Sequence, residues 1–188
     1  FYEAAPAILG MTPTAFRKDG AGVEIRFAVG QCSLGALLVA ASDTGICEIA
    51  LHDDPEQLVR NLQDRFKAAR LIGADREFEQ WMAAVVGFVE NPSVGLHLPL
   101  DVRGTAFQRR VWEALRDIPV GATATYTDIA ERIGAPSAVR AVARACATNN
   151  IALAIPCHRV VRTDGSLAGY RWGIDRKREL IEREALAA

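Results

Sequence analysis

The feature that most constrains this chain is the stretch from Ile155 to Val161, in which a cysteine, a histidine and an arginine lie inside an apolar run. The apolar residues 152–155 predict a buried, strand-like segment, and Pro156 must end it because proline has no backbone N–H to give to a ladder. Cys157 is therefore expected where the chain leaves a core, buried yet reachable from a pocket. Its thiolate would be a strong nucleophile, favoured by neighbouring cations or a hydrogen-bonded histidine. The alternative is a packing residue, because free cysteine is among the most buried residue types.

Composition and cysteine content indicate a cytoplasmic protein with a substantial core. The chain has 188 residues, 50% of them hydrophobic, which suits one medium domain or two small ones. Its four cysteines form no Cys-x-x-Cys pair, so we expect reduced thiols rather than disulfides or a zinc ribbon. No run reaches the roughly 18 apolar residues of a membrane span, and we expect no signal peptide and no membrane partner. Because the sequence begins with Phe1, we expect it to be part of a longer chain.

Charge is distributed unevenly along the chain, although the formal net charge is −1. Residues 1–100 carry 8 Lys and Arg against 13 Asp and Glu, whereas residues 101–188 carry 14 against 10. The basic excess of the second half favours an anionic partner for that half.

The first half predicts a short tail followed by a small domain of a sheet and helices. Alternating and apolar runs over residues 22–52 predict a small antiparallel sheet. Pro55 opens a helix, and aromatic residues at helical spacing predict a second helix over residues 75–89. The charge balance changes sign at an extended connector over residues 93–103. We therefore expect a tail and two domains, over residues 1–20, 21–100 and 101–188.

The second half predicts a helix-turn-helix. Residues 127–133 predict a short helix with Thr127 as its N-cap, and a Gly-containing turn follows. Ser137 is then expected to cap a second helix over residues 138–147. Two short helices joined in this way are typical of a DNA-binding motif.

Other parts of the second half complete the predicted fold. Helices are expected over residues 105–117 and 175–187, and the Gly- and aromatic-containing residues 167–173 are typical of a loop that forms a pocket. The fold class is therefore α+β, with a small sheet-plus-helix domain followed by a mostly helical domain.

The second helix of the helix-turn-helix combines small and basic residues. Ala138 and Ala141 would allow close approach to a nucleic acid, and Arg140 and Arg144 lie one turn apart where they could meet phosphates or bases. The alternative is an ordinary alanine-rich packed helix with two solvated arginines.

The cysteine stretch belongs to a series of motifs. Its own motif is Pro156-Cys157-His158-Arg159-Val160, and the series continues on both sides with Tyr126, Arg140, Asn149, Gly165, Gly169-Tyr170-Arg171-Trp172-Gly173, Lys177 and Glu184. In its residues and their order the series resembles the O6-alkylguanine-DNA alkyltransferase family, closely over residues 105–186 and more loosely over the N-terminal domain.

The resemblance implies a repair reaction in which the protein itself takes up the alkyl group. Cys157, as its thiolate, would attack the alkyl carbon, chiefly methyl, on O6 of guanine in one irreversible displacement. Glu184 would orient His158, which would accept the thiol proton through a water. Tyr126 would assist the leaving base as general acid. The implied partner is double-stranded DNA containing O6-alkylguanine, bound by a monomer without a cofactor in this part of the chain.

The resemblance also assigns residues to the substrate and to DNA. The residues implied to contact the substrate are Asn149, Tyr170, Arg171, Trp172, Cys146 and Val160. Those implied to contact DNA are Arg140, Ala138, Ala141, Arg144 and Thr127. Asn149 would brace the active-site backbone, Cys146 would pack in the pocket, and Trp172 would disfavour large O6 substituents such as benzyl. The base would be flipped out through the minor groove, with Arg140 filling its place in the stack.

The first residues carry a second resemblance. Leu9-Gly10-Met11-Thr12-Pro13 followed by Phe16-Arg17 is similar to the end of an AraC-type DNA-binding domain. An AraC-type module before an alkyltransferase is the arrangement of the Ada-like adaptive-response proteins, which combine repair with transcription control. The chain therefore resembles the carboxy-terminal part of such a protein, and zinc is expected only in the upstream part.

Other readings remain open on the residues alone. A purely regulatory helix-turn-helix protein needs no reactive thiol, and a cysteine hydrolase needs an oxyanion hole and a hydrolysable intermediate. A non-catalytic damage sensor would lack Cys157. A zinc site built from the remaining candidate ligands is disfavoured because their spacing matches no metal-binding motif. Those candidates are Cys32, Cys47, His52 and His97, of which the two cysteines are expected in the core.

Overall fold

A computed structural model describes residues 22–188 and confirms the predicted α+β class. The described residues form two compact units, namely residues 22–86 with His97–Arg103, and Gly87–Leu96 with Gly104–Ala188. The structure thus assigns the end of the predicted connector, His97–Arg103, to the first unit. The upstream tail predicted for residues 1–20 lies outside the described residues.

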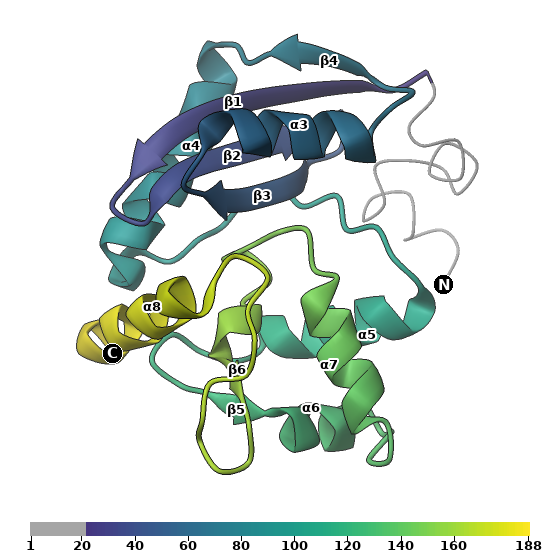
Figure 1. Ribbon diagram of the computed structural model, residues 1–188, viewed down its shortest axis with the longest axis vertical. Helices are drawn as coiled ribbons and strands as arrows, with labels where there is room; N and C mark the ends of the chain where they lie inside the picture. Colours follow the sequence, from purple (N-terminus) through teal and green to yellow (C-terminus); the bar gives the residue numbers. More distant parts are fainter. Residues whose placement is uncertain (1–21) are drawn as a thin grey trace. The chain divides into compact units, whose positions relative to one another are not determined.

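The first unit is built on a mixed four-stranded sheet, coloured purple to blue in Figure 1. Its strands are β1 (Glu24–Cys32), β2 (Gly35–Ala41), β3 (Ile46–His52) and β4 (Arg70–Gly73), in the order β3-β2-β1-β4. The pairs β1–β2 and β2–β3 are antiparallel, as predicted, but β4 runs parallel to β1. The antiparallel sheet predicted for residues 22–52 is therefore confirmed. The strand β4 lies outside that range and was not predicted, because its four residues are too few to show a period in the sequence.

Two helices complete the first unit. Asp54 caps α3 (Pro55–Arg65) by accepting a hydrogen bond from the backbone N–H of Glu56, and α3 buries its leucines against β2 and β3. The helix α4 (Arg76–Glu90) runs behind the sheet in Figure 1. Cys47 is buried, as predicted, but Cys32 is only half-buried near the end of β1, so the prediction of a core position for Cys32 is wrong.

The connector after α4 is part of the first unit's fold. The backbone N–H of Ile46 donates to the carbonyl of Pro99 (2.8 Å), and that of Asp101 donates back to Ile46 (2.8 Å). The buried Asp101 carboxylate accepts hydrogen bonds from Ser42 (2.6 Å) and from Nε of Arg103 (3.0 Å). These bonds hold residues 97–103 against the start of β3.

The second unit is mostly helical, as predicted. Its helices are α5 (Ala106–Arg116), α6 (Tyr126–Arg132), α7 (Val139–Ala147) and α8 (Ile174–Ala187), with 3-10 turns η1 (Pro92–Val94) and η2 (Cys157–Arg159). The two-residue strands β5 (Ala124–Thr125) and β6 (Val160–Val161) pair in parallel. No helix within residues 22–188 is long and apolar enough to cross a membrane.

The helix-turn-helix forms between α6 and α7, but both predicted caps are wrong. The N-cap of α6 is Thr125, whose hydroxyl accepts from the backbone of Asp128 while the Asp128 carboxylate accepts from the backbone of Thr125. Thr127 lies inside the helix instead. The N-cap of α7 is Ala138, with no side-chain hydrogen bond, so Ser137 does not cap it. Cap preference alone cannot distinguish two threonines that lie two positions apart in the sequence.

The apolar segment before the cysteine is buried but is not a strand. Residues 152–154 form consecutive turns, and Leu153 has a positive φ of 71°. The backbone N–H of Ile155 donates to the carbonyl of Ile151 (3.1 Å). An apolar run reports burial and not conformation, which is why the strand-like prediction for residues 152–155 is wrong.

Candidate active site

Cys157 begins the short turn η2 directly after Pro156. Its backbone N–H donates to the carbonyl of Ile155 (2.8 Å), and the N–H of Arg159 donates to the carbonyl of Pro156 (3.0 Å). The thiol is thus fixed at a tight turn, and the residue is 4% exposed. Burial raises the pKa of Cys157 above 9.0, although the hydrogen bond from Asn149 and the charge of Lys177 act to lower it. The resting group is therefore a thiol.

Asn149, just after α7, contacts the thiol directly. Its Nδ2 donates to Sγ of Cys157 (3.3 Å) and to the carbonyl of Ile155 (2.9 Å), and its Oδ1 accepts from the backbone N–H of Ile151 (2.9 Å). The side chain is fully buried. The geometry agrees with the predicted bracing of the backbone and adds a contact to the sulfur.

The next residue, His158, is paired with Glu184 from α8. The His158 Nε2 and Glu184 Oε1 atoms are 2.7 Å apart. Because a carboxylate only accepts hydrogen bonds, Nε2 carries the proton and Nδ1 has the free lone pair. Within the described residues, Nδ1 is buried and has no hydrogen-bond partner. Burial lowers the pKa of His158 below 6.5, against the opposing effect of Glu184, so the ring is neutral at pH 7.

Arg159 holds the other side of the Glu184 carboxylate. Its Nε donates to Oε2 (2.8 Å) and its Nη2 to Oε1 (2.9 Å), while Nη1 donates to the carbonyl of Ile118 (2.6 Å). Burial alone would raise the pKa of Glu184, but hydrogen bonds from His158 and Arg159 lower it to about 2. Glu184 is therefore ionised, and its position is fixed by two partners. Sequence reasoning assigned Arg159 no role beyond its place in the motif.

Lys177 is a second site residue to which the sequence assigned no role. It is fully buried in α8, and its Nζ donates to the carbonyl of Val160 (2.6 Å). Burial lowers the pKa of Lys177, while Cys157 and Cys146 raise it. The signal in the sequence was the match of Lys177 to the family series, because nothing in the helical pattern predicts a buried lysine. The backbone carbonyl of Val160 thus accepts a hydrogen bond from Lys177.

Three more of the predicted site residues interact electrostatically with the thiol. Burial, then Cys146 and Cys157, raise the pKa of Tyr126 to about 12, so its hydroxyl keeps its proton. Burial and Cys157 raise the pKa of Cys146 to about 12 as well. The Tyr170 hydroxyl is buried without a hydrogen-bond partner among the described residues. Its pKa is raised well above 10.0 by burial, then by Cys157 and Glu184. Cys157 thus contributes to the raised pKa of all three groups.

We call residues 167–173 the pocket loop, and it has no helix or strand. The Tyr170 and Trp172 rings meet edge to face, with centroids 5.2 Å apart. Trp172 is 7% exposed, so it is a packed residue. Nη1 of Arg171 donates to the carbonyl of Asn149 (2.9 Å) and to Oδ1 of Asn150. The loop is therefore tied to the residue that contacts the thiol.

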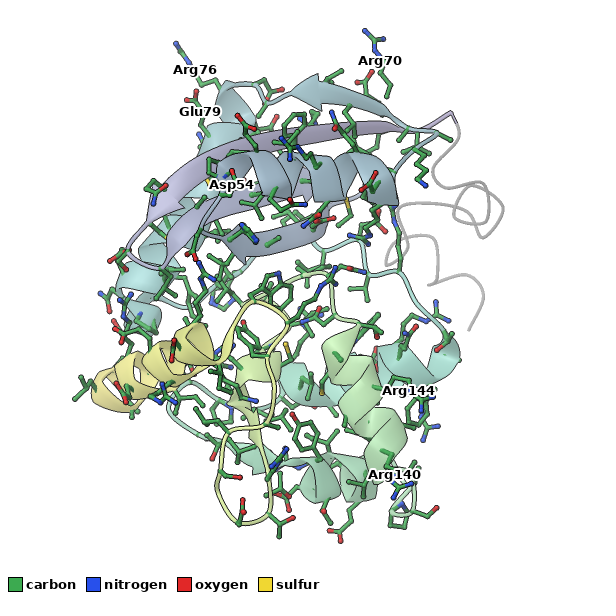
Figure 2. The ribbon with its side chains drawn as sticks, viewed as in Figure 1. Asp54, Arg70, Arg76, Glu79, Arg140 and Arg144 are labelled. Carbon is green, nitrogen blue, oxygen red and sulfur yellow. The ribbon has the colours of Figure 1, made fainter. Side chains whose placement is uncertain are left out.

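The predicted DNA-contacting residues lie on α6 and α7. Figure 2 shows Arg140 and Arg144 along α7, and both are exposed. Ala138, Ala141 and Thr127 are half-buried. The opposite face of α7 is packed and carries Val142, Ala145 and Cys146. The helix thus presents its arginines outward while Cys146 faces inward.

No metal cluster accompanies this site. Throughout residues 22–188, no three His, Cys, Asp or Glu side chains are grouped so that they could hold a metal ion. The weak alternative of zinc at Cys32, Cys47, His52 or His97 therefore has no support in the geometry.

Comparisons with known proteins agree with this arrangement. A model of the family described as 6-O-methylguanine DNA methyltransferase, DNA binding domain, matches residues 106–186. The chain is 51% identical over 185 residues to the bifunctional transcriptional activator/DNA repair enzyme Ada of Escherichia coli (strain K12), covering 98% of this chain and 52% of that protein. It is 35% identical over 151 residues to the inducible methylated-DNA–protein-cysteine methyltransferase of Bacillus subtilis (strain 168), covering 80% of this chain and 84% of that protein.

A solved structure of a related protein has a similar fold. The crystal structure of Mycobacterium tuberculosis OGT in complex with DNA matches with a TM-score of 0.70 at 33% identity, over 88% of this chain and 95% of that chain. Fold and site define a protein with one buried, hydrogen-bonded cysteine beside a helix-turn-helix. The chain belongs to the methylated-DNA–protein-cysteine methyltransferase family. It spans about half the length of Ada of Escherichia coli, 52% of that protein.

Proposed function

We propose that this chain repairs double-stranded DNA by moving an alkyl group, chiefly methyl, from O6 of guanine to Sγ of Cys157. One observation carries the proposal. The buried thiol receives a hydrogen bond from Asn149 (3.3 Å), and the adjacent His158 has a buried Nδ1 without a partner among the described residues. A nucleophile with a nearby proton acceptor is what a single displacement requires.

The thiol proton must leave before or during the attack. Burial raises the pKa of Cys157, so the thiolate does not form unaided at neutral pH. We infer that Nδ1 of His158 takes this proton through one water, because adjacent side chains seldom touch each other. Glu184, paired with Nε2, stabilises the resulting imidazolium. Arg159 keeps Glu184 in place from the other side.

The displacement itself balances without a cofactor. A carbon–sulfur bond forms between the alkyl carbon and Cys157 while the carbon–O6 bond breaks, and its electron pair goes to the guanine. Tyr126 keeps its proton at neutral pH, since its pKa is about 12, and it would donate a hydrogen bond or that proton to the leaving base. The thioether is stable, so each molecule acts once.

The base must reach a buried cysteine, which requires it to leave the duplex stack. We propose that α7 enters the minor groove, with Ala138 and Ala141 allowing close approach and Arg140 occupying the space in the stack. Arg144 and Thr127 would contact the backbone. Minor-groove readout is degenerate, so little sequence preference is expected. The selectivity would come from weak pairing of the damaged base and its fit beside Cys157.

The remaining predictions concern the longer protein. The match to Ada of Escherichia coli supports the proposal that the whole protein also regulates transcription through upstream DNA-binding domains. We further propose that this part acts as a monomer in the cytoplasm, since one molecule carries every residue of the reaction.

Transfer to the protein can be measured directly. The chain is mixed with duplex DNA containing O6-methylguanine, and mass spectrometry follows the intact protein and its peptides. We expect one methyl group on the peptide that contains Cys157, in a stoichiometric reaction that stops there. The Cys157→Ser variant should gain none, and the matched control Cys32→Ser, in the first unit, should react normally.

Other outcomes would identify the competing functions. DNA binding without methyl transfer would favour a regulator or a damage sensor. Repeated turnover of a thioester substrate without lasting modification would favour a cysteine hydrolase. Methylation of another cysteine in the wild-type chain would contradict the assignment of Cys157.

A further inference from the structure

The pocket loop depends on side-chain contacts for its position. Residues 167–173 have no helix or strand, and a turn closed by Gly173 N–H and the Tyr170 carbonyl (3.0 Å) ends the loop before α8. Outside that turn, Nη1 of Arg176 donates to the carbonyl of Trp172 (2.9 Å). The first of these contacts lies within the loop, and the second joins the loop to α8. Arg171 reaches from the loop to Asn149 and Asn150, just past the end of α7.

Arg171 contacts both the end of α7 and the aromatic part of the loop. Its Nη1 donates to the carbonyl of Asn149 (2.9 Å) and to Oδ1 of Asn150. Its guanidinium carbon lies 5.6 Å from the Trp172 ring centroid, within the range of a cation–π contact. The Asn149 carbonyl lies just past the C-terminus of α7, where a cation is favoured by the helix dipole. One side chain therefore joins the aromatic part of the loop to the end of the recognition helix.

The same contacts lead to the reacting atom. Asn149, whose carbonyl accepts from Arg171, donates its side-chain amide to Sγ of Cys157. Tyr170, next to Arg171 in sequence, meets the ring of Trp172 at 5.2 Å. The Tyr170 hydroxyl is buried without a partner among the described residues, and the proximity of Cys157 contributes to its raised pKa. A series of contacts thus runs from the aromatic pair through Arg171 and Asn149 to the thiol.

We propose that Arg171 is a specificity-determining residue that anchors the Tyr170–Trp172 pair to Asn149 and Asn150 and thereby limits the size of the alkyl group that Cys157 can accept. With the anchor in place, the pair leaves room for methyl and excludes benzyl. This inference rests on the proposed function and refines its substrate class. It also changes the expected role of Arg171, because the side chain serves the loop rather than contacting the substrate.

The anchor can be tested without DNA. Free O6-benzylguanine transfers its benzyl group to the same thiol in the proposed reaction, and it has no phosphate for an arginine to bind. The Arg171→Met variant keeps an apolar side chain of similar length and removes every donor. We expect it to react with O6-benzylguanine about tenfold faster than wild type, as loss of a charge-assisted hydrogen bond shifts an equilibrium by about that factor. Methyl transfer from duplex DNA should change far less.

A second variant removes the acceptor, rather than the donor, of the hydrogen bond between Arg171 and Asn150. Asn150→Ala removes one acceptor of Arg171 and should raise benzyl reactivity by a smaller factor. The double variant should react no faster than Arg171→Met alone, because both substitutions break the same contact. The control Arg178→Met makes the same chemical change at the exposed ion pair with Asp175, and its benzyl reactivity should equal that of wild type.

The quantity measured is the ratio of the benzyl rate to the methyl rate. An unchanged ratio in Arg171→Met, or a fall of both rates together with a lower melting temperature, would overturn the inference. Additive effects of the two substitutions would also overturn it. A wild-type chain that takes no methyl from DNA would instead refute the proposed function, so the two failures can be told apart.

Discussion

Glu184 is a buried carboxylate that pairs with both His158 and Arg159. It is 1% exposed and lies between His158 and Arg159, which together lower its pKa from 4.5 to about 2. A depressed pKa in the folded state adds stability above pH 4.5, and that stability is lost as the pH falls toward about 2. The pKa of His158 is also lowered, so acid disfavours the fold at this residue too.

We expect Glu184→Gln to lower the free energy of unfolding by about 3 kcal/mol at neutral pH, because it leaves Arg159 buried without its counter-charge. The unfolding free energy of the variant should also fall less steeply than that of wild type between pH 4.5 and about 2. Urea unfolding at several pH values measures both. Glu56→Gln, at an exposed pair with Arg60, is the control and should change little. Equal slopes for wild type and Glu184→Gln would contradict the assignment.

Lys177 places a buried positive charge near the nucleophile. Its Nζ holds the Val160 carbonyl at 2.6 Å, and its charge lowers the pKa of Cys157 against the effect of burial. In Lys177→Met the pKa of Cys157 should rise further. We expect methyl transfer at neutral pH to slow by about tenfold, because a smaller fraction of the thiol is then ionised.

The pH profile distinguishes this effect from a change in folding. The rate of Lys177→Met should recover as the pH rises, whereas a misfolded variant would stay slow at every pH. Arg178→Met, next in sequence but exposed, is the matched control. An unshifted profile for Lys177→Met would show that its charge does not act on Cys157.

The structure brings together residues that the family series had grouped. Cys157, His158 and Glu184 were assigned together through the family series, and the structure brings His158 and Glu184 to 2.7 Å. Arg159 and Lys177 were given no role, because a charged residue in a pattern is by default a solvated one. Their burial follows from tertiary contacts with Glu184 and the Val160 carbonyl, which no local pattern contains.

At the scale of elements, α6 begins at Tyr126, one residue before the predicted start at Thr127. Thr125 and Asp128 form a reciprocal capping box, and the helix starts at Tyr126. Thr125→Ala should therefore lower the free energy of unfolding by about 1 kcal/mol. Thr127→Ala, the position predicted from the sequence, should have an effect within about 0.5 kcal/mol. Thermal unfolding of the two variants tests the assignment of Thr125 as the N-cap. A larger loss of stability in Thr127→Ala than in Thr125→Ala would contradict it.

Other elements show why parts of the fold could not be predicted. The helices α3 and α4 have clear apolar stripes and were located closely. The strand β4 has four residues, and its parallel pairing with β1 depends on the intervening α3 rather than on a local turn. The residues 152–155 are buried in turns that include the positive φ of Leu153. Apolar composition predicted their burial but carried no signal for that conformation.

At the scale of the whole molecule, charge decides how the chain can bind DNA. The formal net charge is −1, so overall attraction to a polyanion is not expected. Binding must instead come from a local positive field, and the exposed Arg140 and Arg144 on α7 provide one. The affinity for DNA should therefore depend more on where a positive charge lies than on the net charge of the chain.

Two single substitutions that change the net charge equally separate these possibilities. Arg144→Ala removes a charge on α7, whereas Arg70→Ala removes one from β4, where the side chain is 79% exposed. Fluorescence anisotropy with a labelled duplex, repeated at several salt concentrations, gives the slope of log K against log salt. We expect Arg144→Ala to reduce that slope by about 1, the loss of one phosphate contact, and Arg70→Ala to leave it unchanged. Equal changes in the two variants would mean that the net charge of the chain, and not the arginines of α7, governs its affinity for DNA.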